Sequence, residues 1–349
     1  MGARARSSTR ALGLGLGLVG LVALGLGASG CRKKGDGGAM PLCLIEVAAN
    51  SATESEAQEL PPDIWFSIML KSFDREQMLP AEDSRDCSGT DVITPTLPPL
   101  AEGEEAMPGD GPLVVAGCPI APDPGEGRLP NRPLTEDDLV VDDAADGMQL
   151  VWVKTAHYQD GSAVGPVALI EWTKKGIAVR GLGSLRAHAS KARMRMERSG
   201  DTQVLVVESD KCDDQGKHCQ RMMRLLPLLN MRFSSVPLKK EDDGSCLGPA
   251  EFALFEQHVS ILPDGWNRKF EINRSVTFKG DVPLIAEVVT IRDQDPAQPD
   301  APPQEFRDAQ TERRLVYDAR SFETRRSLWD EMIANYGSVA HDAKVEEEE

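Results

Sequence analysis

The sequence has few aromatic and histidine side chains, and it carries no local signature of a catalytic site. Aromatic residues make up 5% of the 349 residues, and there are five histidines. A phosphate-binding loop, a zinc-protease motif and a Gly-x-Ser-x-Gly turn are all missing. His188 has Ser184 and Ser190 close in sequence, but scattered Ser, His and Asp residues do not define a triad. The sequence therefore gives no specific enzymatic chemistry.

Positive charge is also scarce. The chain has 39 Lys and Arg against 56 Asp and Glu, a formal net charge of −17. Residues 1–30 hold three arginines and no acid, so the chain without them has a net charge of −20. Such an acidic chain is a poor candidate for binding nucleic acid or for adsorbing broadly to an anionic membrane.

Long apolar runs are missing except at the N-terminus. Residues 11–27 are apolar but rich in glycine, which is too short and too weakly helical for a spanning segment. Arg4, Arg6 and Arg10 precede the run, and small residues follow it. This order predicts a secretory signal over residues 1–30, in preference to a transmembrane anchor.

The end of this segment, Ala28-Ser29-Gly30-Cys31, resembles a bacterial lipobox, although Ala28 stands where such motifs favour leucine. The resemblance implies that Cys31 is lipidated and becomes the N-terminus. The absence of an aspartate after Cys31 then implies the outer membrane, and we expect the periplasmic side, with surface display as the alternative. Residues 31–40 are typical of a Gly-rich tether, spanning about 16 Å. Release as a soluble exported protein is the other alternative.

Six further cysteines remain, and an even number in an exported chain predicts three disulfides. Cys212 and Cys219 lie close in sequence and are expected to close a hairpin. Of the three pairings open to the others, we favour Cys87–Cys118 with Cys43–Cys246. A metal site at Cys219 beside His218 is the competing interpretation, but the Cys-x-x-Cys spacing is missing.

The hydropathy pattern predicts a mainly β domain over residues 41–337, an antiparallel meander in the form of a barrel, sandwich or propeller-like sheet. Residues 193–196 alternate arginine with methionine, which is typical of a strand with one buried face. Further strands are expected at 42–48, 63–70, 112–117, 150–155, 167–173, 177–182, 191–198, 203–208, 220–226, 232–237, 255–262, 269–278, 284–292 and 313–317.

Residues 80–133 are rich in proline, glycine and acids and are expected to be held by cysteines. The acidic segment Leu134–Gly147 suggests a calcium site, but Ala144 interrupts the ligand pattern, so a solvated turn or short helix is favoured. A sub-boundary near residues 133–148 is possible.

One helix is predicted, over Ser321–Tyr336. Ser321 can cap its start, Gly337 can end it, and Phe322, Trp329, Ile333 and Tyr336 share one stripe. We expect this stripe to pack on the sheet. Residues 338–349 end in four glutamates and are typical of a disordered tail.

Two basic strand regions stand out in this acidic chain. They could form a stripe that binds an anionic glycan, a lipid headgroup or an acidic protein surface, since arginine suits carboxylates and phosphates. The alternative is that these cations decorate the solvent face and pair with the chain's own acids. The candidate residues are Arg186, Arg193, Arg195, Arg221 and Arg224.

The sequence thus favours a membrane-anchored periplasmic lipoprotein that acts as a non-enzymatic binding or scaffold module of the cell envelope. The expected partners are the membrane, through the N-terminal lipid, and an envelope protein or anionic ligand. No cofactor and no metal are expected. A carrier of a lipid-like ligand in a β cavity is the first alternative, and an envelope hydrolase is the second.

Overall fold

The computed structural model describes residues 40–45, 60–100, 113–121, 127–174, 176–212 and 219–341. The predicted signal segment, Cys31, the predicted tether up to residue 39 and the acidic residues from 342 onward lie outside the described residues. Within the described residues, no helix is both long enough and apolar enough to cross a membrane. Residues 41–349 form one unit.

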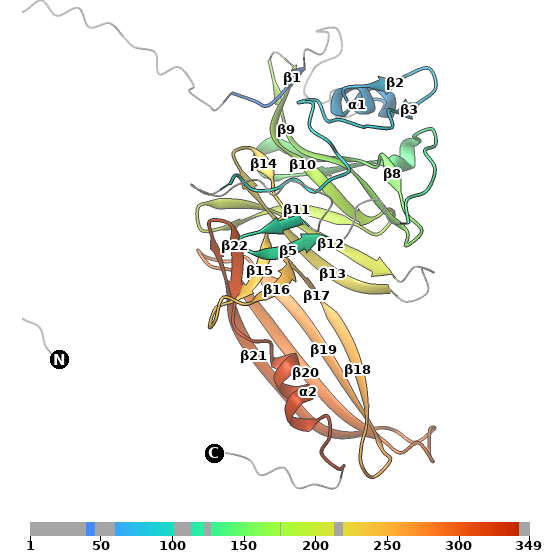
Figure 1. Cartoon of the computed structure of the whole chain (residues 1–349), viewed down its shortest axis with the longest axis vertical. Helices are drawn as coiled ribbons and strands as arrows, with labels where there is room; N and C mark the ends of the chain where they lie inside the picture. Colours follow the sequence, from blue (N-terminus) through green and yellow to red (C-terminus); the bar gives the residue numbers. More distant parts are fainter. Residues whose placement is uncertain are drawn as a thin grey trace, which may run out of the picture. The chain divides into compact units, whose positions relative to one another are not determined.

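The protein is mainly β, as predicted, and its first sheet curls into a barrel-like form (Figure 1). Its strand order is β11-β12-β13-β14-β10-β9-β7-β6, and the two edge strands, β11 and β6, are in contact with each other. The strands are β6 (Leu139–Asp143), β7 (Met148–Val153), β9 (Ser162–Thr173), β10 (Gly176–His188), β11 (Arg193–Ser199), β12 (Thr202–Cys212), β13 (Cys219–Leu229) and β14 (Arg232–Phe233). Three short strands pair at its side: β1 (Leu44–Ile45), β8 (Ala156–His157) and β17 (Glu251–Ala253).

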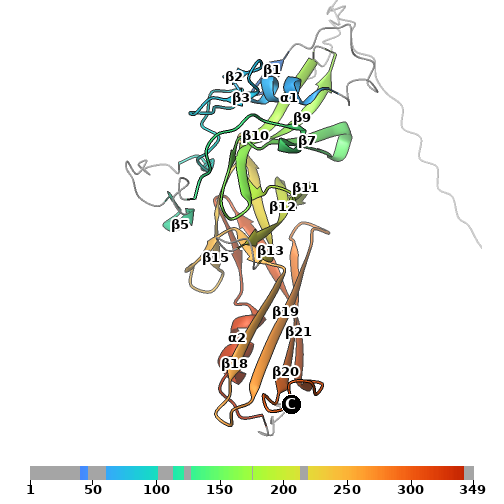
Figure 2. The same cartoon turned by 90° about the vertical axis from the view of Figure 1, so that its right-hand side faces the viewer.

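The second sheet has seven strands in the order β16-β15-β22-β21-β20-β19-β18. Helix α2 (Leu328–Tyr336) lies against one of its faces (Figure 2) and packs on a core formed by Phe270, Ile272, Val289 and Ile291. The strands are β15 (Pro237–Lys240), β16 (Cys246–Pro249), β18 (Phe255–Ile261), β19 (Asn267–Thr277), β20 (Leu284–Gln294), β21 (Gln304–Asp318) and β22 (Ser321–Thr324). Most pairs in both sheets are antiparallel, but β10–β14 and β15–β22 are parallel, which a pure meander would not contain.

The remaining elements are short. Helix α1 (Pro62–Met69) packs on the first sheet, and β2 (Phe73–Asp74) pairs with β3 (Leu79–Pro80), as β4 (Leu113–Val115) pairs with β5 (Cys118–Ala121). The acidic segment forms two 3₁₀ turns, Glu136–Asp138 and Ala145–Gly147, on either side of β6. The sequence pattern does not predict strand β6, because its apolar residues do not alternate with polar ones. Leu139 and Val140 are half buried, and Val141 is exposed.

One of the predicted elements is wrong in type. The strand predicted at residues 63–70 is instead the helix Pro62–Met69, and its Trp65, Phe66 and Met69 enter the core under the first sheet. A short apolar run fits either a buried strand or a buried helix, and here the proline at the first helical position agrees with the helix.

The predicted C-terminal helix starts later than expected. Residues 321–324 form β22, which turns back on β21, and Phe322 is buried in the core between the sheets instead of on the helix stripe. Ser327 caps α2, because its hydroxyl accepts a hydrogen bond from the Trp329 amide. The Glu287 carboxylate accepts a second one from the Leu328 amide. The first residues after the helix are also packed, since His341 stacks on Trp266 at 3.9 Å.

The disulfides agree with the predicted count but only partly with the predicted pairing. Cys212 pairs with Cys219 across the β12–β13 hairpin, as expected. The favoured pairing Cys87–Cys118 with Cys43–Cys246 is wrong, because the structure joins Cys43 to Cys87 and Cys118 to Cys246. Closeness in sequence misleads here, since β5 carries Cys118 to the second sheet while Cys87 stays beside α1 and β10.

The three bridges should differ in their effect on stability. They close loops of 128, 44 and 7 residues. Loop-closure entropy predicts that replacing both cysteines by serine costs about 5 kcal/mol for Cys118–Cys246, about 4 kcal/mol for Cys43–Cys87 and about 2.5 kcal/mol for Cys212–Cys219. Urea unfolding of the three double variants measures this order. A loss from the hairpin pair equal to that from Cys118–Cys246 would contradict it.

Candidate ligand site

The five arginines of the predicted basic stripe lie on two different faces of the sheet. Residues directly opposite each other on neighbouring strands share a face. Arg195 lies opposite Val206 of β12, and Arg221 lies opposite Asp210 of the same strand. Val206 and Asp210 are four residues apart and so share a face, as do Arg193 and Arg195 on β11. Arg193, Arg195 and Arg221 therefore lie on one face of β11–β13. Arg224 lies opposite Val207 and projects from the other face, toward Arg186 of β10.

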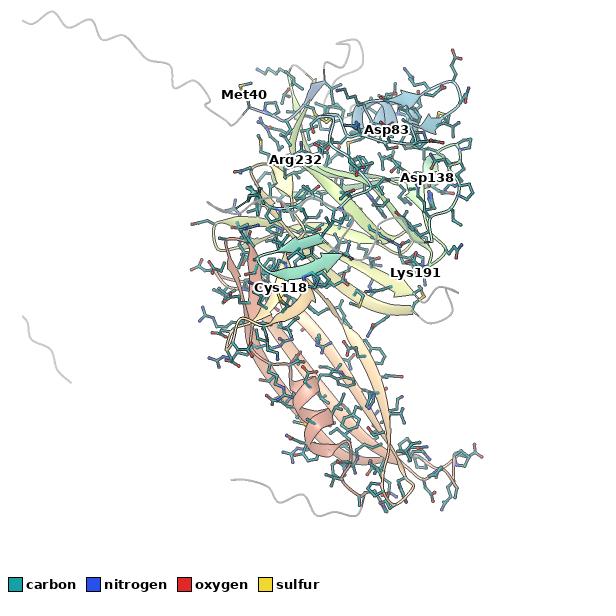
Figure 3. All side chains as sticks on the ribbon, in the orientation of Figure 1. Met40, Asp83, Cys118, Asp138, Lys191 and Arg232 are labelled. Atoms are coloured by element: carbon teal, nitrogen blue, oxygen red, sulfur yellow. A yellow bond between two sulfur atoms is a disulfide. The ribbon has the colours of Figure 1, made fainter. Side chains whose placement is uncertain are left out.

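Acidic neighbours hold most of these cations. Arg195 pairs with Glu197 and Glu208, and Arg221 pairs with Asp210 at 3.1 Å. Lys191 shares the Asp210 carboxylate at 3.1 Å, while Arg232 lies well apart from Lys191 (Figure 3) and binds Asp86 at 2.9 Å. Arg193 is exposed and makes no ion pair within the described part of the chain. The geometry therefore agrees with the alternative of internal pairing over most of this surface.

A cavity of about 220 Å³ lies between the C-terminal half of β10 and the β12–β13 hairpin. Strand β10 meets the short β14 only at Leu182, and beyond that point it runs free of β13. Its far end is tied back by the backbone N–H of His188, which donates to Ser209 Oγ at 2.7 Å. The space left between these two contacts is the cavity.

The segment at residues 92–96 and Ile120 of β5 cover the cavity. Ser184 of β10 holds the segment at residues 92–96 in place. Its hydroxyl donates to the Val92 carbonyl at 2.7 Å, and its amide donates to Thr96 Oγ1. The disulfide from Cys118, labelled in Figure 3, ties β5 to β16. The cover is thus fixed by hydrogen bonds and a covalent bond rather than by burial alone.

Arg186 is held at one wall of the cavity. Its Nε donates to Ser162 Oγ at 2.9 Å, a terminal nitrogen donates to Asp160 at 3.2 Å, and the guanidinium lies 3.7 Å above the ring centre of Tyr158. Burial alone would raise the pKa of Asp160, but hydrogen bonds from Ser162 and the charge of Arg186 lower it. Asp160 is therefore charged at neutral pH.

Arg224 stands at the opposite wall and crosses to β10. Its Nε and one terminal nitrogen bind Glu251 of β17, and the other terminal nitrogen donates to the Arg186 carbonyl at 3.0 Å. Lys211 also contacts Glu251 at 3.1 Å. Burial would raise the pKa of Glu251, but Arg224 and Lys211 outweigh it and lower the pKa to about 2. Glu251 thus fixes both cations at the cavity wall.

His188 lines the same cavity but does not form a catalytic triad. Its Nδ1 lies near Ser190, 3.4 Å from the hydroxyl, in the turn after β10, and within the described residues no carboxylate is hydrogen-bonded to its ring. Burial and the charge of Lys191 lower the pKa of His188, so its ring is neutral at pH 7. Gly161 packs over the ring, since a Cβ there would come within 3.2 Å of Nε2.

Comparison with protein-family models, curated proteins and solved structures finds no match to this chain. The function of the site can therefore be inferred only from its own geometry. In the described part of the chain, no group of three or more His, Cys, Asp or Glu side chains gathers in a way that could hold a metal ion.

Sequence reasoning found two of the cavity's charged residues, Arg186 and Arg224, and missed their partners. Asp160 sits in a turn whose sequence indicates only a break between strands, and Glu251 begins a three-residue strand that carries no periodic signal. Glu251 lies directly opposite Arg224 in the register of β13 and β17. Only that pairing, which sequence spacing does not reveal, brings the two together.

Replacing Glu251 by glutamine should remove a pH-dependent part of the stability. Because the folded-state pKa of Glu251 is lowered to about 2, the carboxylate stabilises the fold above about pH 4.5 and loses this effect as the pH falls toward 2. We expect Glu251→Gln to cost about 3 kcal/mol at pH 7 and progressively less between pH 4.5 and pH 2. Urea unfolding across this pH range measures the difference.

The matched control is Glu241→Gln. Glu241 pairs with Arg325 at the surface, and both side chains are largely exposed, so this change should alter stability at neutral pH by less than about 0.5 kcal/mol. A pH-independent difference between Glu251→Gln and the unchanged protein would show that the Glu251 carboxylate is not the titrating group.

Proposed function

We propose that this protein is a lipid-anchored binding module of the cell envelope that holds a small organic anion in the cavity between β10 and β12–β13. It acts by binding, without catalysis. The observation that carries the proposal is the cavity itself, with a fixed guanidinium at each of two walls and a pinned cover. Concave sites with a few converging polar groups are the usual form of small-ligand sites.

The size of the cavity favours a compact ligand. A cavity of 150 Å³ accommodates benzene, so about 220 Å³ corresponds to roughly nine non-hydrogen atoms. A lipid with long acyl chains needs several times that volume. The dimensions therefore support a small ligand over the lipid-like cargo that a β cavity also suggested from sequence.

The lining supports a ligand with an apolar body and an anionic end. Ile93, Ile120, Val164 and Leu226 contribute apolar surface. Arg186 and Arg224 keep further N–H groups beyond those that bind Asp160 and Glu251, since each guanidinium carries five donors. Their positions are already fixed, so binding a carboxylate or phosphate costs little side-chain entropy.

The proposed anchor rests on the signal segment and Cys31, together with the cations at positions 32–34. Two or more acyl chains on Cys31 would hold the protein at the membrane permanently, whereas a single chain would not. The short tether would then keep the folded domain at the membrane surface, and ligand would be captured there. The acidic folded domain supplies no general attraction to anionic lipid.

Replacing Cys31 by alanine should release the protein from the membrane. With no acyl chains, the variant is expected to partition into the aqueous phase of a Triton X-114 extraction, whereas the unchanged protein enters the detergent phase. Metabolic labelling with a palmitate analogue should mark only the protein that retains Cys31. Persistent membrane association of Cys31→Ala without label would contradict the lipid anchor.

Filling the cavity should abolish ligand binding. Benzoate has nine non-hydrogen atoms and one carboxylate, so we expect it to bind with millimolar or better affinity, measured by saturation-transfer NMR and calorimetry. Ser235 lines the cavity and its side chain makes no hydrogen bond with the described residues. Ser235→Phe should weaken benzoate binding by about tenfold or more, since its ring occupies the space of the ligand.

The control for this experiment is Ser275→Phe, which adds the same ring at an exposed position of β19. It should bind benzoate as the unchanged protein does. Native mass spectrometry of the protein purified from cells would show a small co-purifying ligand that Ser235→Phe lacks. Equal binding by both phenylalanine variants would exclude the cavity as the site.

A further inference from the structure

Three of the four edges of the two sheets are protected against pairing with another strand. Strand β11 carries Arg193, Arg195 and Arg198 and approaches β6, which carries Asp142 and Asp143. Strand β16 contains a proline and is joined to β5 by the Cys118–Cys246 disulfide. Charges, proline and a covering segment are the usual means by which proteins prevent edge-to-edge association.

Strand β18 is the fourth edge (Figure 1), and it has none of these protections. Phe255–Ile261 contains no lysine, arginine or proline, and it pairs with β19 without a bulge. Its one charged residue, Glu256, is neutralised by Arg274 at 2.9 Å. Meanwhile Phe255, Val259 and Ile261 are 39%, 55% and 78% exposed.

The residues of β18 that carry these apolar side chains also carry the backbone groups that do not bond to β19. The Arg274 amide donates to the Leu254 carbonyl, and the Leu262 amide donates to the Trp266 carbonyl. In an antiparallel ladder, alternate residues bond to the same neighbour, so the even-numbered residues bond to β19. Residues 255, 257, 259 and 261 therefore point their N–H and C=O groups away from β19. The Phe255 carbonyl accepts a hydrogen bond from Gln220 Nε2 at 3.4 Å. Within the described residues no strand pairs with this edge.

We propose that β18 pairs with β18 of a second copy of this chain, antiparallel and centred on His258. In this register Phe255 faces Ile261 of the partner subunit, and Gln257 faces Val259 of the partner subunit. All of these are outward-pointing residues, so their backbone groups meet in hydrogen-bonded pairs, in which the Phe255 carbonyl exchanges Gln220 for the amide of Ile261 of the partner subunit. Glu256 faces Ser260 of the partner subunit, so the two carboxylates do not oppose each other.

The charge pattern near the edge also permits close approach. On the face of Val259, Lys269 and Arg292 both bind Glu271 at 2.9 Å and 2.8 Å, so the adjoining strands carry paired charges. A two-fold axis at His258 makes the contact isologous and closed, which stops growth into fibres. Two seven-residue strands bury less than a standard interface, so the dimer is weak and forms with micromolar affinity.

Sedimentation velocity of the full-length chain carrying Cys31→Ser tests the proposal, since a lipid cannot then drive association. We expect reversible dimers at protein concentrations of tens of micromolar. Val259→Lys should weaken dimerisation by about tenfold or more, because a charged side chain on an edge strand opposes pairing with another strand, as the arginines of β11 do. The control is Val288→Lys, on the inner strand β20, where the side chain is 44% exposed; it should dimerise normally. A protein that stays monomeric, or a Val259→Lys variant that still dimerises, overturns the proposal.

Cross-linking tests the register independently. His258 lies at the two-fold axis in a non-hydrogen-bonded pair, where Cα atoms are about 4.5 Å apart, which suits a disulfide. His258→Cys should therefore form a covalent dimer with a 258–258 bond, identified by mass spectrometry and reversed by reductant. Val288→Cys, also exposed but away from the edge, should not. A dimer without the 258–258 bond overturns this pairing.

Discussion

The structure depends on the burial of both faces of the β12–β13 hairpin. Val204, Leu205, Val206 and Val207 are all 1% exposed or less. Leu205 and Val207 join the core inside the first sheet, while Val204 and Val206 join the core between the first sheet and the second. Because both faces of this hairpin are apolar, each face must be buried by other strands. The first sheet therefore needs the second sheet to bury the outer face of β12–β13.

This requirement also creates the cavity. The second sheet and β17 cover one end of the hairpin, and β17 takes an edge position on β13 that β10 would otherwise occupy. Strand β10 pairs with β14 at Leu182 and with neither β13 nor β14 beyond it, and charged and polar residues line the space at that end. Arg224 bridges the separation by binding Glu251 on one side and the Arg186 carbonyl on the other. Arg224, held by Glu251, thus connects β13 to β10 where no backbone pairing joins the two strands.

The elements that sequence predicted correctly are those with a strong local pattern. The alternation of Arg193 to Met196, the hairpin closed by Cys212 and Cys219 and the long strands after residue 149 are local signals, and the structure confirms these strands. The predictions for residues 63–70 and Phe322 are wrong because their apolar residues are buried in either secondary structure. The pairing of Cys118 with Cys246 and of Arg224 with Glu251 depends on contacts across more than 25 residues, which spacing alone cannot supply.

Many cations of this acidic chain form ion pairs that hold its carboxylates in fixed positions. Arg268 is fully buried and binds Asp293, and Arg274 and Arg313 together bind the buried Glu287 at the start of α2. Such pairs add little net stability, but breaking one leaves an uncompensated charge in the interior, so they select one arrangement of strands and helix. With aromatics at 5% of the sequence, side-chain shape provides less of this selection. Arg186 and Arg224 are likewise held by acids, Asp160 and Glu251, but unlike the buried pairs they line a cavity. The anionic end of the proposed ligand would bind to these two positioned guanidinium groups.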